Sequence, residues 1–151
     1  MATDQPFYES VLSFSGVLLG FVVLMVSWRI GREAEFDQPP IRHIPIGMSL
    51  GAAAALLLIF LCILPSLIFL RTGSAWSPSL SAGALLSALV CVIGHIVTEA
   101  AHYDLFVKRE DRQEHSYAAD GLVSYKKHTV MSTLSFFFLA GITLVVGWLW
   151  I

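Results

Sequence analysis

Charged residues are scarce in this chain of 151 residues. Aspartate, glutamate, lysine and arginine make up 13% of it, whereas hydrophobic residues make up 56%. A soluble domain usually carries about 25% charged residues. Because so few charged side chains cannot cover the outside of a folded chain, we expect most of its surface to contact lipid. The formal net charge of −2 gives no indication of nucleic-acid binding.

Cysteine is also scarce, and known catalytic motifs are absent from the sequence. The two cysteines, Cys62 and Cys91, lie in apolar runs, which excludes a disulfide framework and a Cys-x-x-Cys metal site. The sequence contains no G-x-S-x-G, no H-E-x-x-H and no glycine-rich phosphate loop. The segments between the apolar runs are too short to form a catalytic domain. We therefore expect a protein that is not an enzyme.

The first ten residues contain no lysine or arginine, so they lack the positive segment of a secretory signal. The apolar run after them is about 20 residues long and is followed by Arg29 and Arg32. This order predicts a retained membrane helix and not a cleaved leader.

Four windows are apolar over the roughly 20 residues that a helix needs to cross a hydrocarbon core of ~30 Å. They cover residues 10–30, 46–70, 80–101 and 129–150. No window alternates apolar and polar residues as the strands of a membrane barrel do. The sequence therefore predicts an all-α integral membrane protein, a single transmembrane domain over residues 1–151, whose four helices form an antiparallel bundle. Pro65 predicts a kink in the second helix.

Two connections, 31–45 and 102–128, carry most of the charge. The first contains three prolines and is expected to be a loop. In the second, the front half is expected to continue the third helix, and the chain is expected to reverse direction at Asp120 and Gly121. Only Arg71 lies on the opposite side of the predicted membrane from the other eight basic residues, which are Arg29, Arg32, Arg42, Lys108, Arg109, Arg112, Lys126 and Lys127. The positive-inside rule therefore places both loops in the cytoplasm and both termini outside, in a plasma membrane or an organellar inner membrane.

Small residues recur at spacings that let helices approach closely in lipid. The predicted helix-packing positions are Gly16, Gly20, Gly47, Gly51, Gly83 and Ser87. In one interpretation these faces hold a single four-helix bundle together. In the other, one glycine face meets a different protein.

A polar stripe runs along the third helix. His95, Glu99 and His102 span roughly 60° of its circumference. Ionisable groups inside a membrane are costly and usually face the bundle interior or water. In a structural interpretation, Glu99 pairs with a basic residue, and His95 bonds to a neighbouring helix, for instance to Ser132 or Ser135.

Two further interpretations of the stripe remain open. Glu99-x-x-His102 has the spacing of di-iron bundles, but the further intramembrane carboxylates of such a site are missing. A b-type haem at His95 would take His43 or His128 as its second ligand. Alternatively, the stripe belongs to a proton path, because histidine titrates near neutral pH. No cofactor is predicted, and the identity of any metal ligand is left open.

The function that this sequence favours is a non-catalytic accessory or structural subunit of a larger membrane complex. Its expected partners are the lipid bilayer and other membrane subunits. The first alternative is a homo-oligomeric ion or proton channel or transporter that uses His95, Glu99 and His102. The second is a redox membrane protein that binds haem or a metal.

Overall fold

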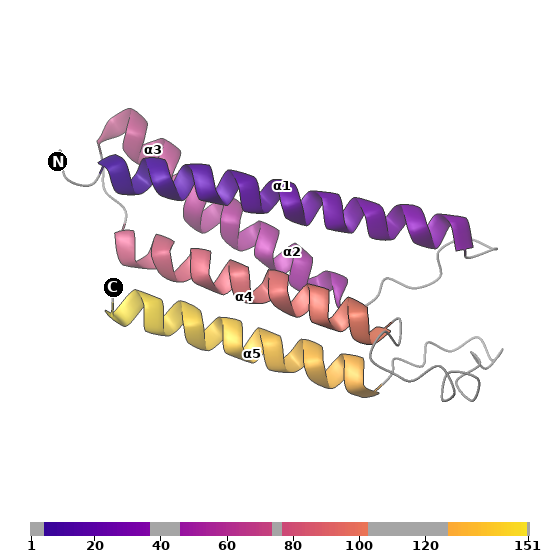
Figure 1. The fold of residues 1–151 in the computed structure, drawn as a ribbon. Coiled ribbons are helices and arrows are strands. Elements are labelled where there is room, and N and C mark those ends of the chain that lie inside the picture. The colour runs from indigo at the N-terminus through magenta and orange to yellow at the C-terminus, as the bar shows by residue number, and fades with distance from the viewer. Residues whose placement is uncertain (1–4, 37–45, 74–76, 103–126, 151) are drawn as a thin grey trace.

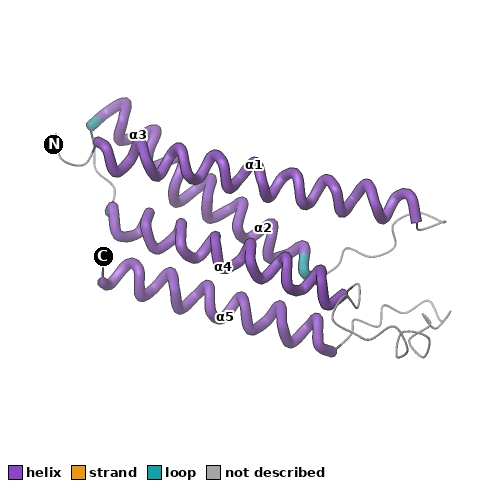
Figure 2. The backbone as a smooth tube through the Cα atoms, in the orientation of Figure 1, coloured by secondary structure: helices purple, strands orange, loops and turns teal. Residues whose placement is uncertain are grey.

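The chain folds as a bundle of membrane-length helices. The structure, a computed structural model, describes residues 5–36, 46–73, 77–102 and 127–150 (Figure 1). Its helices are α1 (Gln5–Phe36), α2 (Met48–Leu57), a π-helical segment (Leu58–Ile63), α3 (Leu64–Thr72), α4 (Pro78–His102) and α5 (Lys127–Trp150). The tube in Figure 2 runs through α2, the π-helical segment and α3 without a break. These three form one span of the bundle.

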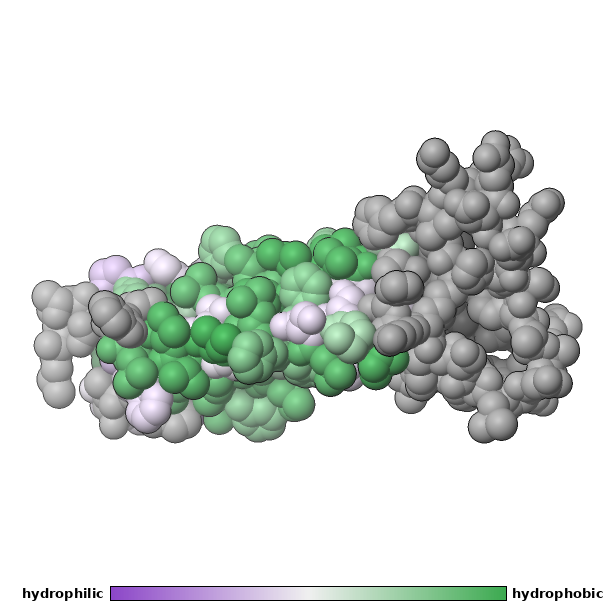
Figure 3. All heavy atoms as spheres, turned by 90° about the horizontal axis from the view of Figure 1, so that it is seen from below, coloured by the Kyte–Doolittle hydropathy of each residue, from purple (hydrophilic) through white to green (hydrophobic). Residues whose placement is uncertain are grey.

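Within the part of the chain that the structure describes, four helices are long and apolar enough to cross a membrane. They comprise Gln5–Gly31, Met48–Thr72, Pro78–Ala100 and Thr129–Leu149. Large apolar side chains such as Phe14, Val17 and Phe138 point outward, and apolar residues cover most of the described face in Figure 3. Apolar side chains on the outside suit a lipid solvent, and the prediction of an all-helical chain with four helices long and apolar enough to span a membrane is confirmed.

The first helix is longer than the sequence predicted. Residues 31–36 were expected to begin a loop, but α1 continues through them to Phe36. The prolines that suggested a loop stand later, from Pro39 onward, while the segment Arg32–Glu35 consists of good helix formers. The rest of the connection 31–45, which is residues 37–45, lies outside the described residues, and so do residues 103–126 of the connection 102–128.

Pro65 marks an irregularity in the second span. Proline has no amide hydrogen to give the preceding turn, and the helix widens to π geometry over Leu58–Ile63, immediately before it. The Ser66 hydroxyl donates to the carbonyl of Cys62 at 2.7 Å. Local π geometry and a serine hydroxyl are ways in which membrane helices satisfy backbone groups near a proline.

Helices α4 and α5 lie side by side along their lengths (Figure 1). Gly83 and Gly147 form a close backbone contact: a Cβ atom on Gly83 would lie 2.9 Å from the Leu144 carbonyl oxygen and 3.1 Å from the Trp148 nitrogen. The Ser87 hydroxyl donates to the Ala140 carbonyl at 2.8 Å in the same interface. Two of the predicted packing positions, Gly83 and Ser87, therefore lie between helices.

Helix α1 contacts the bundle through one stripe of residues. Its buried residues include Tyr8, Ser15, Val22 and Arg29, which repeat every seven positions. Gly16 and Gly20 have nothing within 4 Å of an added Cβ. The seven-residue stripe turns these two glycines outward, so the interpretation in which they hold this bundle together has no contact among the described residues, and the interpretation in which a glycine face meets a different protein stays open.

Candidate functional site

Three helices meet in a cluster of polar groups, which we call the polar junction: Arg29 of α1, Gly47 at the start of α2, and His95, Thr98 and Glu99 of α4. It lies near the end of the bundle where α1 and α4 end and α2 and α5 begin, which we call the Met48 end (Figure 1). The opposite end holds the start of α1 and the end of α5. The junction is the only place among the described residues where an ion pair is found in the interior.

The ion pair joins α1 to α4. Arg29 Nη1 lies 3.2 Å from Glu99 Oε2, and the two side chains are only 1% and 11% exposed. Opposite charges attract more strongly when little water screens them, but taking each of them out of water costs several kcal/mol. Separating the two side chains would leave an uncompensated charge in the interior, so the pair fixes the position of α1 against α4.

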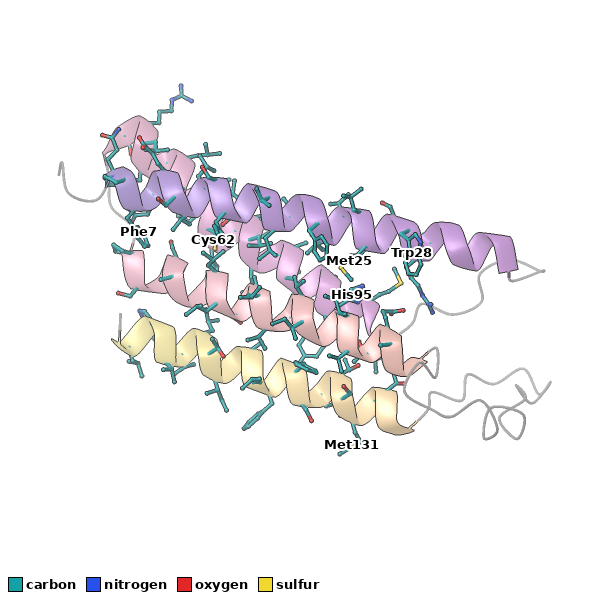
Figure 4. The ribbon with its side chains drawn as sticks, viewed as in Figure 1. Phe7, Met25, Trp28, Cys62, His95 and Met131 are labelled. Atoms are coloured by element: carbon teal, nitrogen blue, oxygen red, sulfur yellow. The ribbon has the colours of Figure 1, made fainter. Side chains whose placement is uncertain are left out.

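His95 joins α4 to α2. Its Nδ1 lies 2.9 Å from the carbonyl oxygen of Gly47, and Figure 4 shows the ring between the two helices. A carbonyl oxygen can only accept, so Nδ1 must carry the hydrogen that it donates. The partner of His95 is thus a backbone group of α2, and not Ser132 or Ser135 of α5. Ser135 instead donates to the Met131 carbonyl of its own helix at 2.9 Å.

Gly47 lets the start of α2 reach the junction. A Cβ atom there would lie 2.6 Å from Thr98 Oγ1 and 3.1 Å from Glu99 Oε1. The Glu99 carboxylate therefore lies against the N-terminal end of α2, where the helix dipole favours negative charge. The Thr98 hydroxyl donates hydrogen bonds within its own helix, to the carbonyl oxygens of Gly94 at 2.8 Å and His95 at 2.9 Å.

Gly51, one turn further along α2, faces the same junction. An added Cβ would lie 3.4 Å from Val26 Cγ2 and 3.9 Å from His95 Cγ, which is ordinary van der Waals contact. Gly47 and Gly51 therefore both lie at helix contacts, the positions for which the sequence singled them out. At Gly47 the fit is too close for any side chain.

The stripe of three residues is only partly seen. His95 and Glu99 both enter the junction, whereas the side chain of His102, the last residue of α4, lies outside the described part of the chain, as do His43 and the side chain of His128. Among the described residues, no three His, Cys, Asp or Glu side chains come together in a way that could hold a metal ion.

Sequence reasoning missed Arg29 as the partner of Glu99. It counted Arg29 as one of the positive charges that flank a loop, which is its role under the positive-inside rule. A signal was present, because Arg29 continues the seven-residue spacing of Tyr8, Ser15 and Val22. A charged residue in register with a buried stripe is expected to find a partner inside the bundle.

Replacing His95 with leucine is expected to loosen the start of α2. The change removes one hydrogen bond, for which we expect a loss of about 0.5–1.5 kcal/mol in the free energy of unfolding. Hydrogen–deuterium exchange in detergent micelles should show faster exchange at Ser49–Gly51. Ile96→Leu, a lipid-facing change one residue away on α4, is the matched control. Equal exchange in the two variants would mean that His95 does not anchor α2.

Several other buried polar side chains of the bundle bond to backbone carbonyls. Cys62 Sγ donates to Ser81 of α4 at 3.5 Å, and Thr133 donates to Thr129 of its own helix at 2.8 Å. Both cysteines are free and buried.

No family model, no curated protein and no solved structure matches this chain.

Proposed function

We propose that this protein is a non-catalytic accessory or structural subunit of a larger membrane complex. The observation that carries the proposal is the polar junction, in which the intramembrane groups His95 and Glu99 are engaged by Gly47 and Arg29 of the same chain. Groups held in this way serve to fix helices, and that is the task of a structural subunit. Close packing of α4 against α5 at Gly83 supports the same proposal, since it holds these two helices together.

The outward face of α1 is where we propose that a neighbouring subunit binds. Gly16 and Gly20 are four residues apart on the lipid side, and none of the described atoms of the chain lies within 4 Å of a Cβ added at either position. Two such glycines allow another transmembrane helix to approach the backbone closely. Inside the bundle, by contrast, α1 packs through its seven-residue stripe, so this face is not needed for folding.

We further propose that the four spans are antiparallel neighbours and that both termini lie on the outer side. The distribution of lysine and arginine supports this orientation, because eight of the nine basic residues flank or lie in the connections at the Met48 end. That end would then face the cytoplasm, or the matrix if the membrane is an organellar inner membrane.

Gentle purification from the native membrane tests the subunit proposal. We expect other membrane proteins to accompany the chain in fixed stoichiometry by mass spectrometry. The variant Gly20→Ile should lose them, because its branched side chain keeps a partner helix at a distance. Gly141→Ile is the matched control, since Gly141 of α5 is equally open and lies on a different helix.

Three results would overturn the proposal. The chain could purify alone, or as a homo-oligomer whose conductance depends on Glu99, in which case a channel is the better account. A Soret band that disappears in His95→Ala would instead identify a haem protein. Equal loss of partners in Gly20→Ile and Gly141→Ile would argue against α1 as the contact surface.

A further inference from the structure

The second span holds about one residue more than a regular α-helix would. Its completely buried positions recur every four residues, at Ala54, Leu58, Cys62 and Ser66. Four such positions span three turns, for which an α-helix takes about 11 residues, whereas this span takes 12. The π-helical segment takes up the excess, since the Leu64 amide donates to the carbonyl of Ile59, five residues earlier.

The π-helical segment therefore decides which face of α3 is buried. If Leu58–Ile63 were an ordinary α-helix, every residue after it would be turned by about 100°, the angle of one residue position. Each buried place would then be taken by the preceding residue of the chain. The residues that would enter these places are all apolar: Leu61, Leu64, Pro65 and Ile68.

The surroundings of α3 oppose this turn only weakly. Helices in lipid gain nothing by hiding apolar surface, so an exchange of Phe69 for Ile68 on the buried face has no hydrophobic cost. The Ser66 hydroxyl stays paired when it faces lipid, because its acceptor is the Cys62 carbonyl of the same span. Helix α3 also packs mainly against the start of α1 (Figure 1), so the turn disturbs one main helix interface.

Two contacts hold α3 in the observed state. The Phe69 ring stacks on Tyr8 of α1, with centroids 4.2 Å apart and planes at 26°. The Cys62 thiol donates to the Ser81 carbonyl of α4 at 3.5 Å. A thiol is a weak donor, so the ring stack is the stronger of the two. Leu61 is also larger than the cysteine that it would replace, which keeps the turned state the minor one.

From these features we propose that Leu58–Ile63 is a register switch within the second span. In its second state the segment is α-helical and α3 has turned by one residue position, with Phe69 facing lipid. The Tyr8 ring holds the first state, so a movement of the start of α1 away from α3 releases the turn. The switch involves neither the polar junction nor Gly16 and Gly20, so it does not rest on the proposed function.

Fluorine NMR of the full chain in lipid nanodiscs tests the switch, with para-fluorophenylalanine in place of Phe69. We expect a major signal shielded from oxygen dissolved in the lipid and a minor signal broadened by it, since the turned ring takes the exposed place of Leu70. Tyr8→Leu removes the ring stack and should raise the ratio of minor to major signal about two- to tenfold. Phe14→Leu removes a lipid-facing ring of the same helix and, as the matched control, should leave the ratio unchanged.

Deletion of Ile59 distinguishes the switch from a loosely packed α3. Without the extra residue the segment becomes α-helical with Phe69 still opposite Tyr8, so a single shielded signal should remain, even in combination with Tyr8→Leu. The control is deletion of Leu89, a similarly exposed residue of the regular helix α4. It should abolish the cooperative unfolding transition in SDS, because no π-helical segment absorbs the shift there.

Four results would overturn the proposal. Tyr8→Leu could show only the shielded signal, or the same signal ratio as Phe14→Leu. Deletion of Ile59 could abolish cooperative unfolding as deletion of Leu89 does, which would mean that the span has no residue to spare. It could also leave both signals in place, in which case the minor signal does not come from a change of register.

Discussion

The variant Arg29→Met is expected to lower the free energy of unfolding by about 3–5 kcal/mol, the usual effect of removing one partner of a buried ion pair. The Glu99 carboxylate would keep its place in the interior but lose the guanidinium at 3.2 Å. The measurement is unfolding by SDS titration of protein in mild micelles, followed by circular dichroism. Glu99→Met should have an effect of similar size, since it leaves the arginine charge buried.

The control for this prediction is Arg71→Met. Arg71 lies in the last turn of α3 and its side chain is exposed, so we expect a change within about 0.5 kcal/mol. The double variant Arg29→Met/Glu99→Met should recover most of the stability lost in either single variant, because replacing both members of a buried pair is often close to neutral. If the two losses simply add, the residues act independently and the ion pair does not hold α1 to α4.

The same pair shows what the sequence could and could not predict. Hydropathy alone gave all four spans, because their length and apolar character are set by the bilayer. It also marked Glu99 as a residue that needs an explanation. The identity of its partner depends on how α1 is rotated, which is fixed by the fit of whole helix faces and not by any local spacing.

Rotation of α1 also explains why Gly16 and Gly20 have no described part of the bundle near them. A pair of glycines four residues apart predicts that a helix can approach closely, but does not say which helix. The buried face of α1 consists of residues that include Tyr8, Ser15, Val22 and Arg29. Tyr8 stacks on Phe69 of α3 with ring centroids 4.2 Å apart. Only knowledge of these contacts separates an interior glycine face from an outward one.

Helix ends and irregularities were predictable in part. The sequence indicated a disturbance at Pro65, and the π geometry over Leu58–Ile63 immediately precedes it. The end of α1 was misjudged because prolines several residues away were taken to describe the whole connection. His95 was expected to bond to a neighbouring helix, but a backbone carbonyl such as that of Gly47 leaves no trace in the sequence, since every residue has one.

Gly83→Ala is expected to destabilise the bundle by about 1–3 kcal/mol, the usual effect of adding a methyl group to a filled interface. Its new Cβ would lie 2.9 Å from the Leu144 carbonyl oxygen and 3.1 Å from the Trp148 nitrogen. These are backbone atoms, which cannot rotate away as the end of a side chain can, so α4 and α5 must move apart. Gly147→Ala should act in the same direction, since its Cβ would meet the Gly83 Cα from the other helix.

The matched control for the α4–α5 contact is Gly141→Ala, in the same helix as Gly147. An added Cβ there has nothing within 4 Å, and alanine is a better helix former than glycine by up to about 1 kcal/mol. We therefore expect Gly141→Ala to leave stability unchanged or to raise it slightly in the same SDS titration. The sign of the effect is thus decided by the neighbouring backbone, because the chemical change is identical at both positions. Should Gly83→Ala and Gly141→Ala behave alike, α4 and α5 would have to pack less closely than the contact at Gly83 requires.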